Sequence, residues 1–421
     1  MQVLIAGAGI GGLVLALMLH RRGIDCRLYE SAQAIRPLGV GINLLPHAVD
    51  ELEQLGLREA LAELAIETSA LHYYNLHGQP IWQEPRGLAA GYPVPQFSVH
   101  RGEFQMLLAR TVRERLGDAA IVTGMALASA RQDGERAIAT LQARADGSRH
   151  EVGGDVLIGA DGIHSALRRQ WHPSGDEPRF SGRMLWRAVT EAPSYLDGRT
   201  MFMAGHQDQK FVCYPISEPL RRQGRSLINW IAELAVPDAE LPATDWNRSV
   251  DKSVFAERFR DWRWDWIDVP AIIDGASAIY EFPLVDRDPL PRWTRGRLTL
   301  LGDAAHPMYP IGSNGSAQAI LDARCLADWL ERAAQGQVRS TEIALLEYEA
   351  ERLPRTAGIV LRNRLNGPEQ VMQMAHERAP DGYADIGAVI ARHELEAISL
   401  RYKQLAGFDP AALKRAQGAA R

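Results

Sequence analysis

The chain has 421 residues, of which 46% are hydrophobic, and its formal net charge is −5 at pH 7. A chain of this size can bury a large core, which predicts two closely joined domains rather than one. The small negative charge gives no electrostatic reason to expect nucleic acid or an acidic membrane as a partner. The first apolar stretch has no basic region before it and no cleavage pattern after it, so we expect no export signal, no transmembrane helix and a cytoplasmic protein.

The three cysteines, Cys26, Cys213 and Cys325, lie far apart in the sequence. They have none of the paired spacings that are typical of zinc sites or disulfide frameworks. We therefore expect buried, reduced thiols and no bound metal.

The N-terminus predicts a dinucleotide-binding site. An apolar run over residues 2–6 is followed by Gly7, Gly9 and Gly12 in the spacing GxGxxG, and then by the pattern of an apolar helix. The first glycine permits a tight turn, the second lets the backbone approach a pyrophosphate, and the third lets helix and strand pack closely. The pyrophosphate then lies at the helix N-terminus, where free N–H groups favour negative charge. A second strand ends at Glu30, at the distance where an acid accepts hydrogen bonds from ribose hydroxyls.

Helix and strand patterns then alternate along the chain, after a glycine-punctuated loop over residues 38–43. Helices are predicted over residues 48–64, 101–116 and 316–334, and strands over residues 71–74, 81–82, 155–160 and 297–303. A hairpin is predicted over residues 121–152, a mixed sheet within residues 180–282, and a mostly helical segment from residue 335 to residue 421. The first domain is therefore interrupted and later resumed.

Three tryptophans, Trp262, Trp264 and Trp266, are spaced by two residues. Such rings could form a platform for a base or a sugar. The flanking Phe255 and Phe259 favour a helix instead, in which the rings serve as packing.

Two further motifs end predicted strands: GADGIHSALR over residues 159–168 and GDAAHP over residues 302–307. With the N-terminal glycine loop, these motifs in this order resemble the single-component, class A FAD-dependent aromatic hydroxylases, the family of para-hydroxybenzoate and salicylate hydroxylases. The segments 36–43, 100–103, 285–291 and 308–310 resemble in particular the phenazine-modifying branch of that family. The likeness extends from residue 1 to about residue 355, and the tail beyond it diverges.

This resemblance implies an α/β fold. A Rossmann-like FAD-binding domain of the GR2 type is interrupted by a mixed β-sheet substrate domain, and a helical C-terminal region follows. The FAD-binding domain would comprise residues 1–70, 101–179 and 286–355, the substrate domain residues 71–100 and 180–285, and the helical region residues 356–421.

The resemblance also implies the reaction. Bound FAD would be reduced by NADH or NADPH and would react with O2, so that a C4a-hydroperoxyflavin hydroxylates an aromatic or heteroaromatic ring. The nicotinamide cofactor would bind only transiently, because no second complete glycine motif exists. An aromatic acid, with or without decarboxylation, suits this chemistry, and the enzyme would be a monomer or a homodimer. The alternative is a flavoprotein oxidase or dehydrogenase that acts on a small organic substrate without oxygen insertion.

Several residues would bind the flavin by this resemblance. Asp303 would accept hydrogen bonds from ribityl hydroxyls, Arg101 would lie near the phosphates, and Asp161 would serve both FAD and the nicotinamide cofactor. Backbone N–H groups of the loop before Ser316 would point at N1 and O2 of the flavin. The expected cofactor-binding set is Gly7, Gly9, Gly12, Glu30, Arg36, Gly41, Arg101, Asp161, Asp303, Gly312, Ser313, Asn314 and Gly315.

Structural interpretations of the same residues stay open. Asp303 could cap a helix, Asp161 could stabilise a turn, and Arg36 and Arg101 could be solvated cations. His306 could act as an acid or base, but a packing role is favoured for this position of the third motif.

Because the flavin carries the difficult step, the protein needs no nucleophile, and its task is to place the ring and exclude water. The catalytic loop would contain Tyr309, Pro310, Gly312 and Asn314. The substrate pocket would lie between this loop and the mixed sheet, with Arg187 available for a substrate carboxylate. Its candidates are Trp186, Arg187, Met203, Tyr214, Trp230 and Met308, although strand alternation turns about half of each run away from the pocket.

Overall fold

The N-terminal motif is part of a parallel five-stranded sheet with the strand order β21-β12-β1-β2-β8. The computed structural model describes residues 1–37, 39–174, 176–236, 248–411 and 413. The apolar residues of the central strand β1 are almost completely buried, as expected for a parallel sheet covered on both faces. The strands are β1 (Gln2–Ala6), β2 (Asp25–Glu30), β8 (Ile121–Thr123), β12 (Val156–Gly159) and β21 (Leu298–Leu300).

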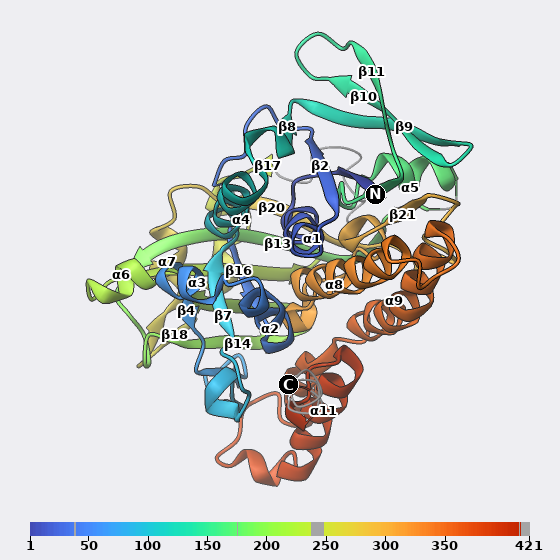
Figure 1. Cartoon of the computed structure of the whole chain (residues 1–421). Helices are drawn as coiled ribbons and strands as arrows, with labels where there is room; N and C mark the ends of the chain where they lie inside the picture. The colour runs from blue at the N-terminus through green and yellow to red at the C-terminus, as the bar shows by residue number, and fades with distance from the viewer. Residues whose placement is uncertain (38, 175, 237–247, 412, 414–421) are drawn as a thin grey trace.

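Helices cover this sheet, and α1 packs against both α4 and α8. These helices are α1 (Ile10–Arg21), α4 (Arg101–Leu116) and α8 (Gly315–Ala334). A separate antiparallel sheet lies at the upper end of the molecule in Figure 1. It contains β9 (Met125–Asp133), β10 (Arg136–Ala143) and β11 (Arg149–Gly154).

The second large layer is an eight-stranded mixed sheet with the order β17-β20-β13-β16-β15-β14-β5-β6. Only β14 and β5 run parallel, and the other neighbours pair antiparallel. Its strands are β5 (Ala70–Tyr74), β6 (Pro80–Pro85), β13 (Arg179–Ala192), β14 (Thr200–His206), β15 (Gln209–Pro215), β16 (Ser226–Ala235), β17 (Arg248–Ser249) and β20 (Tyr280–Asp286). One face of this sheet packs on an aromatic cluster that includes Phe255 and Phe259, and the other face packs towards the C-terminal helices.

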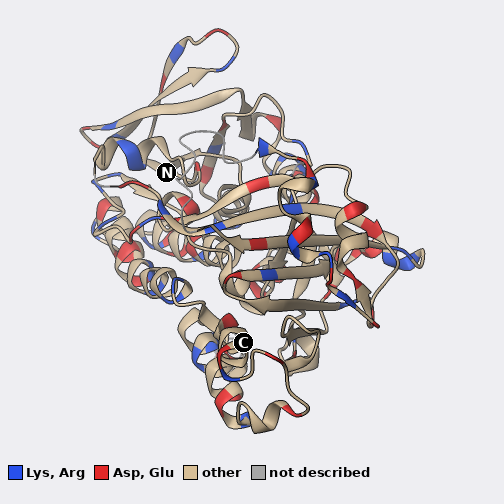
Figure 2. Cartoon of the chain, turned by 180° about the vertical axis from the view of Figure 1, so that it is seen from behind, with Lys and Arg blue, Asp and Glu red and all other residues tan. Residues whose placement is uncertain are grey.

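The C-terminal region continues from α8 into α9 and then folds under the sheet, where α10 contacts β14 and α11 contacts α9 (Figure 1). Its helices are α9 (Thr341–Asn363), α10 (Gln370–Arg378) and α11 (Arg392–Ala406). In the described residues no helix is long and apolar enough to cross a bilayer. Basic and acidic residues are intermixed along the ribbons (Figure 2), in agreement with the small net charge.

Four sequence predictions are corrected by the structure. The helix predicted over residues 48–64 is two helices, α2 (Pro46–Gln54) and α3 (Arg58–Leu64), because Gly56 between them adopts a φ of +70°. The loop predicted over residues 38–43 contains the start of β3 (Gly41–Leu44), which pairs with β7 (Phe97–His100). That small sheet is completed by β4 (Ile66–Glu67).

The third correction concerns residues 121–152, which form β8 and the three-stranded sheet rather than one hairpin. The fourth concerns the tryptophan cluster, which lies on a short hairpin and not on a helix. Its strands are β18 (Arg263–Trp264) and β19 (Ile267–Asp268). The rings of Trp262, Trp264 and Trp266 contact one another at centroid distances of 5.5 and 5.4 Å and serve as packing, as predicted.

Candidate active site

A cavity of about 940 Å³ is lined by residues of both large sheets. The parallel sheet contributes the glycine loop after β1, and the mixed sheet contributes side chains of β13, β14, β15 and β16. The predicted site residues that line it are Gly7, Gly9, Glu30, Arg36, Gly41, Arg101, Asp161, Arg187, Met203, Tyr214, Asp303, Met308, Pro310, Ser313 and Gly315. The others, Gly12, Trp186, Trp230, Tyr309, Gly312 and Asn314, do not line it.

The glycine loop shows why each small residue is needed. A Cβ on Gly7, whose φ is +107°, would lie 2.3 Å from the carbonyl oxygen of Ala160. A Cβ on Gly12 would lie 2.1 Å from the carbonyl oxygen of Gly7, so Gly12 provides close packing behind the cavity. Gly9 has nothing within 4 Å of its Cβ position and faces open space. It also precedes α1 without a capping side chain, which leaves the first N–H groups of the helix available to an anion.

Glu30 lies at the carboxyl end of β2, beside this loop. Its two carboxylate oxygens accept hydrogen bonds from the backbone N–H groups of Ala8 and Ala32, both at 2.8 Å. These bonds hold the carboxylate at the cavity edge. A carboxylate has further lone pairs, which remain available to sugar hydroxyls.

The second and third motifs each place an aspartate at the cavity. Asp161 accepts a hydrogen bond from the N–H of Ala166 through one oxygen, and its other oxygen has no partner among the described residues. Asp303 accepts no hydrogen bond from the described part of the chain. Burial raises the pKa of both carboxyl groups. One oxygen of Asp161 and the carboxylate of Asp303 thus lack donors within the described residues, and such acceptors suit a ligand that is rich in hydroxyl groups.

A buried arginine, which was no site candidate from the sequence, ties these two motifs together. The guanidinium of Arg168 pairs with Asp176 at 2.7 Å and donates to the carbonyl oxygen of Ala305 at 2.9 Å. His306 lies behind the cavity, where its Nε2 is 2.5 Å from Asp322. Asp322 also pairs with Arg352 at 2.7 Å. His306 is therefore part of a buried polar cluster, which agrees with the packing role.

The loop before α8 presents only some of its residues to the cavity. Pro310, Ser313 and Gly315 line it. Gly312 faces the opposite way, since a Cβ there would lie 2.1 Å from the hydroxyl of Tyr402. The side chain of Asn314 is fully buried and donates to that same hydroxyl at 2.9 Å.

Tyr309 also lies behind this loop. Its ring is buried against the mixed sheet and the C-terminal helices, and its carbonyl oxygen accepts a hydrogen bond from Asn363 at 3.1 Å. Tyr309, Gly312 and Asn314 therefore shape the loop from behind and do not reach into the cavity.

One cross-strand row of the mixed sheet forms the opposite wall. Arg187 pairs with Ile231, Ile231 with Val212, Val212 with Met203, and Met203 with Tyr73. Residues opposite one another on neighbouring strands point to the same face, so this row faces the cavity side as a unit. Trp186 and Trp230 have the other parity.

The sequence predicts Trp186 and Trp230 as pocket residues, but alternation turns both to the far face of the sheet. The indole of Trp186 donates to Glu281 at 3.0 Å and stacks on Phe255 at 4.8 Å. The indole of Trp230 donates to Thr190 at 3.0 Å and packs in the same aromatic cluster. Both rings are core residues of the sheet's second face.

Among the described residues that the mixed sheet contributes to the cavity, Arg187 is a cation without an acidic partner. Its guanidinium lies 5.6 Å from the centre of the Phe282 ring, and its Nε has no hydrogen-bond partner among the described residues. No ion pair joins it to a carboxylate in the part of the chain that the structure describes. Burial lowers the pKa of Arg187, nearby Arg101 lowers it further, and Tyr214 opposes both. A half-buried cation without a counterion favours an anionic ligand.

Tyr214 and Asn229 fix the position of Gly41. The Tyr214 hydroxyl donates to the carbonyl oxygen of Gly41 at 2.8 Å, and Asn229 accepts from its N–H at 2.7 Å. A Cβ at this glycine would lie 2.7 Å from both side chains. Asn229 was missed in the sequence, because nothing in its strand marks a link to a distant glycine.

A third missed group is an ion-pair cluster at the cavity wall. The ammonium of Lys210 lies 2.5 Å from Glu369 and 3.0 Å from Glu233. Glu233 pairs in addition with Arg183 at 3.0 Å. The cluster contains two cations and two carboxylates, so it balances its own charges and leaves Arg187 without a counterion from it.

The residues around the cavity fit FAD. Open space at Gly9, the free N–H groups at the start of α1 and the arginines Arg36 and Arg101 suit a pyrophosphate. The free oxygen of Asp161 and the carboxylate of Asp303 suit hydroxyl groups. The fold and this cavity define a protein that holds FAD between two sheets. The chain belongs to the family described as "FAD binding domain", which it matches over residues 1–363.

Named relatives agree with this class. The chain is 46% identical over 373 residues to a phenazine 1,6-dicarboxylic acid hydroxylase of Lysobacter antibioticus, covering 86% of this chain and 89% of the relative. It is 31% identical over 369 residues to a 6-hydroxynicotinate 3-monooxygenase of Pseudomonas fluorescens, covering 85% and 89%. A salicylate hydroxylase substrate complex shares the fold with a TM-score of 0.73 at 21% identity, covering 99% of this chain and 97% of that one. HpxO of Klebsiella pneumoniae, solved with FAD and uric acid, gives 0.71 at 24% identity, covering 95% and 97%.

The predicted family, fold class and cofactor are thereby confirmed, and so is the reaction class. The enzyme is a flavoprotein monooxygenase that uses NAD(P)H and O2 to hydroxylate an aromatic ring. The alternative of an oxidase or dehydrogenase without oxygen insertion finds no support among these relatives.

Proposed function

We propose that the substrate is an elongated aromatic carboxylic acid whose carboxylate pairs with Arg187. The observation that carries this proposal is the unbalanced charge of Arg187 at the cavity wall. A guanidinium can hold a carboxylate through two parallel hydrogen bonds, which fixes the orientation of the ring as well as its position.

The shape of the wall supports a long ring system. Between Arg187 and Met203 the row is apolar, with Ile231 and Val212 on the two strands between them. Neighbouring strands lie about 4.8 Å apart, so this stripe spans roughly 14 Å from β13 to β14. That length exceeds a single benzene ring with its carboxylate and suits fused rings. The relatives named for phenazine dicarboxylic acid, aminohydroxybenzoate and hydroxynicotinate are consistent with an acid as substrate.

When bound, FAD supplies the oxygen-insertion chemistry and takes electrons from NAD(P)H. The chain's own residues bind and orient the reactants. Glu30, Asp303 and the N-terminus of α1 would hold the sugar and pyrophosphate parts, and Arg101 would add positive charge there. The backbone N–H groups at the start of α8 would stabilise negative charge that develops at the cavity. The apolar row would exclude water from the reacting ring.

The test compares an acid with its amide on the FAD-containing enzyme. Phenazine-1-carboxylic acid and its carboxamide have the same ring, and their anaerobic binding is measured from the change in flavin absorbance. We expect the acid to bind about 10 to 100 times more tightly, as a hydrogen bond to a charged group contributes about 1.5–3 kcal/mol. Arg187→Met should bring the acid to the affinity of the amide.

Arg179→Met is the matched control, because Arg179 begins the same strand but is exposed and pairs with Asp288. It should keep the preference for the acid. Incorporation of oxygen from labelled O2 into the product checks the hydroxylation itself. Equal binding of acid and amide to the wild type and to Arg187→Met would refute the proposal.

A further inference from the structure

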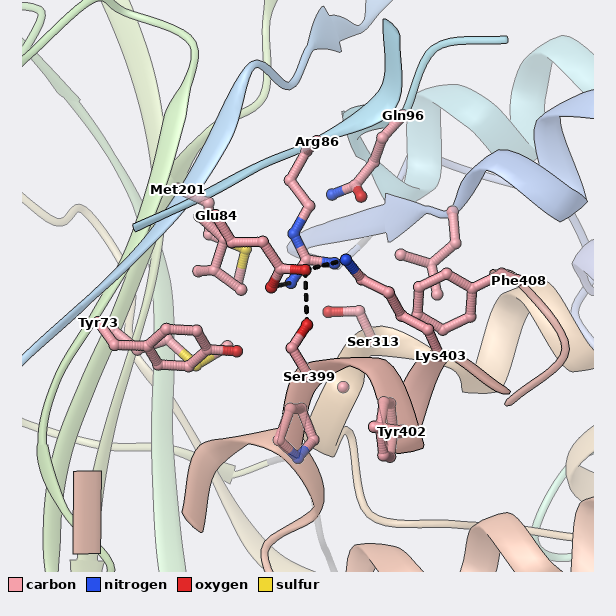
Figure 3. Close-up of a pocket in the computed structure, with 15 residues that line it drawn as sticks. Tyr73, Glu84, Arg86, Gln96, Met201, Ser313, Ser399, Tyr402, Lys403 and Phe408 are labelled. Carbon is pink, nitrogen blue, oxygen red and sulfur yellow. Dashed lines mark hydrogen bonds and ion pairs between the residues drawn. The ribbon is translucent and has the colours of Figure 1, made fainter. Parts of the chain in front are cut away.

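Figure 3 shows a second, much smaller chamber, which shares lining residues with the substrate cavity. It has a volume of about 20 Å³ and lies between strands β5 and β6 and helix α11. Met201, Met203 and Ser313 line both spaces and therefore form the partition between them. The volume admits one water-sized group, such as a single carboxylate oxygen.

The chamber contains more positive than negative charge. Its one carboxylate, Glu84, pairs with Arg86 at 3.1 Å and with Lys403, and it accepts a hydrogen bond from Ser399 at 2.7 Å. Two cations thus share one anion among the lining residues. A buried site of this kind is stabilised by a further negative charge.

Two donors in the chamber lack partners within the described residues. The hydroxyl of Tyr73, whose side chain is only 1% exposed, lies beside the guanidinium of Arg86, which cannot accept its proton, and the Nε–H of Arg86 has no acceptor either. In Figure 3 the Tyr73 hydroxyl points into the chamber, towards Glu84 and Ser399. Buried donors of this kind are usually satisfied. Among the lining residues the Oε1 of Gln96 also lacks a partner, so the chamber offers two donors and one acceptor to a bound group.

The register of the mixed sheet aligns this chamber with the substrate. Tyr73 is the last member of the row that begins at Arg187 and continues through Met203. An aromatic acid held by Arg187 along the apolar stripe therefore points its far end at Met203 and the chamber. Methionine side chains are unbranched and adapt easily, so they can yield to an entering group.

We propose that the chamber binds a second negatively charged substituent of the substrate, so that the enzyme selects aromatic dicarboxylic acids. One oxygen of the far carboxylate enters the chamber and accepts hydrogen bonds from Tyr73 and Arg86, close to the ammonium of Lys403. This inference rests on the proposed function, because the first carboxylate is the one that Arg187 holds.

The experiment compares phenazine-1,6-dicarboxylic acid with phenazine-1-carboxylic acid on the FAD-containing enzyme, by the same anaerobic flavin titration. We expect the diacid to bind at least about 10 times more tightly to the wild type, the effect of one charged hydrogen bond. Tyr73→Phe and Lys403→Met should each remove most of this preference while the monoacid is affected less. Lys252→Met is the matched control, because Lys252 is exposed and pairs with Asp274 elsewhere on the sheet domain.

The outcomes separate the two proposals. If monoacid and diacid bind equally while Arg187→Met weakens both, the acid-binding proposal stands and the chamber holds no more than a water molecule. If the diacid is preferred but Tyr73→Phe and Lys403→Met both keep that preference, the second carboxylate lies elsewhere and the inference is wrong. If Arg187→Met leaves both affinities unchanged, the proposed function itself fails. Retained FAD and an unchanged melting temperature show that each variant is folded, and Tyr73→Phe is close to isosteric.

Discussion

The Tyr402 hydroxyl connects the C-terminal helix α11 to the loop that enters α8. It lies 2.9 Å from the Nδ2 of Asn314, 3.1 Å from the carbonyl oxygen of Ile311 and 3.0 Å from the Oδ1 of Asn363. The side chain is 4% exposed, and burial raises its pKa, so the hydroxyl stays protonated as a donor. Gly312 has no room for a side chain because this hydroxyl occupies the space. Tyr402 is thus a positioning residue for a loop that would face the flavin.

Tyr402→Phe removes this hydroxyl and keeps the ring. Asn314 retains a bond to the carbonyl oxygen of Gly312 at 3.1 Å, so it loses only one of its partners. The single hydroxyl proton of Tyr402 can be donated to only one of Ile311 and Asn363 at a time. The variant therefore loses one hydrogen bond that Tyr402 donates and the one that it accepts from Asn314, which lowers the free energy of unfolding by about 1–3 kcal/mol in a buried site. The melting temperature should fall by no more than roughly 2–4 °C per kcal/mol in a chain of this size. If about 1.4 kcal/mol of this loss also raises the activation free energy of the reaction, kcat falls about tenfold.

The assay follows NAD(P)H oxidation and product formation together. A displaced loop should lower kcat and raise the fraction of NAD(P)H that is consumed without product, with little change in substrate KM. Tyr383→Phe is the control, because its hydroxyl also bonds to carbonyl oxygens but lies on the surface beside Gln79. If Tyr402→Phe lowers the melting temperature while kcat and the product yield stay within a factor of about two, Tyr402 is purely structural and the reasoning is refuted.

Two further predictions concern the cofactor loop and acid stability. Gly9→Ala should leave the melting temperature of the apoprotein unchanged but reduce the FAD retained on purification. Gly7→Ala should lower both, because only a side chain at Gly7 would clash with Ala160. Equal apoprotein stability of the two variants would contradict this expectation. Asp322 is the second case: burial raises its pKa, but His306 and Arg352 outweigh burial and lower it to about 2. Its contribution to stability is therefore complete above its ordinary pKa of about 3.8 and is lost as the pH falls towards 2. Asp322→Asn should cost about 3–5 kcal/mol in urea unfolding at pH 7, with a smaller difference from the wild type at pH 2.5, and a constant difference would show that the carboxylate charge is not responsible.

The cofactor half of the site could be predicted because its constraints are local in the sequence. Gly7, Gly9 and Gly12 act within one turn, and the carboxyl ends of parallel strands lie at one edge of the sheet, where Glu30, Asp161 and Asp303 then meet. The geometry follows from the order of strands and helices. Nothing distant in the chain has to be known.

The substrate half could not be predicted to the same depth. Side chains of a strand alternate between its two faces, and the sequence alone does not show which of the two sets faces the cavity. Met184, Trp186 and Ala188 alternate with Leu185, Arg187 and Val189, so both sides of the strand carry apolar residues. The single arginine does not show whether its side meets solvent or a cavity. The choice is made by a register shift between Phe180 and Met184, where β13 meets β20, and by the aromatic cluster that covers one face. A one-residue change of register exchanges the two faces of a strand, which is why the neighbours Trp186 and Arg187 lie on opposite faces of the sheet.

The tail beyond residue 363 explains why sequence motifs alone do not identify the ring. The family match ends there, yet Glu369 reaches the substrate cavity and Tyr402 and Lys403 reach the loop and the small chamber. These residues arrive from helices that carry no motif, so their roles depend on how the tail packs under the sheet. A relative can therefore keep the flavin motifs and change its substrate by altering only the inner face of the sheet and this tail. It follows that exchanging Lys403 and Tyr73 for residues of a monoacid hydroxylase should change the preference between diacid and monoacid without loss of FAD. No change in the tail alone should create a flavin site.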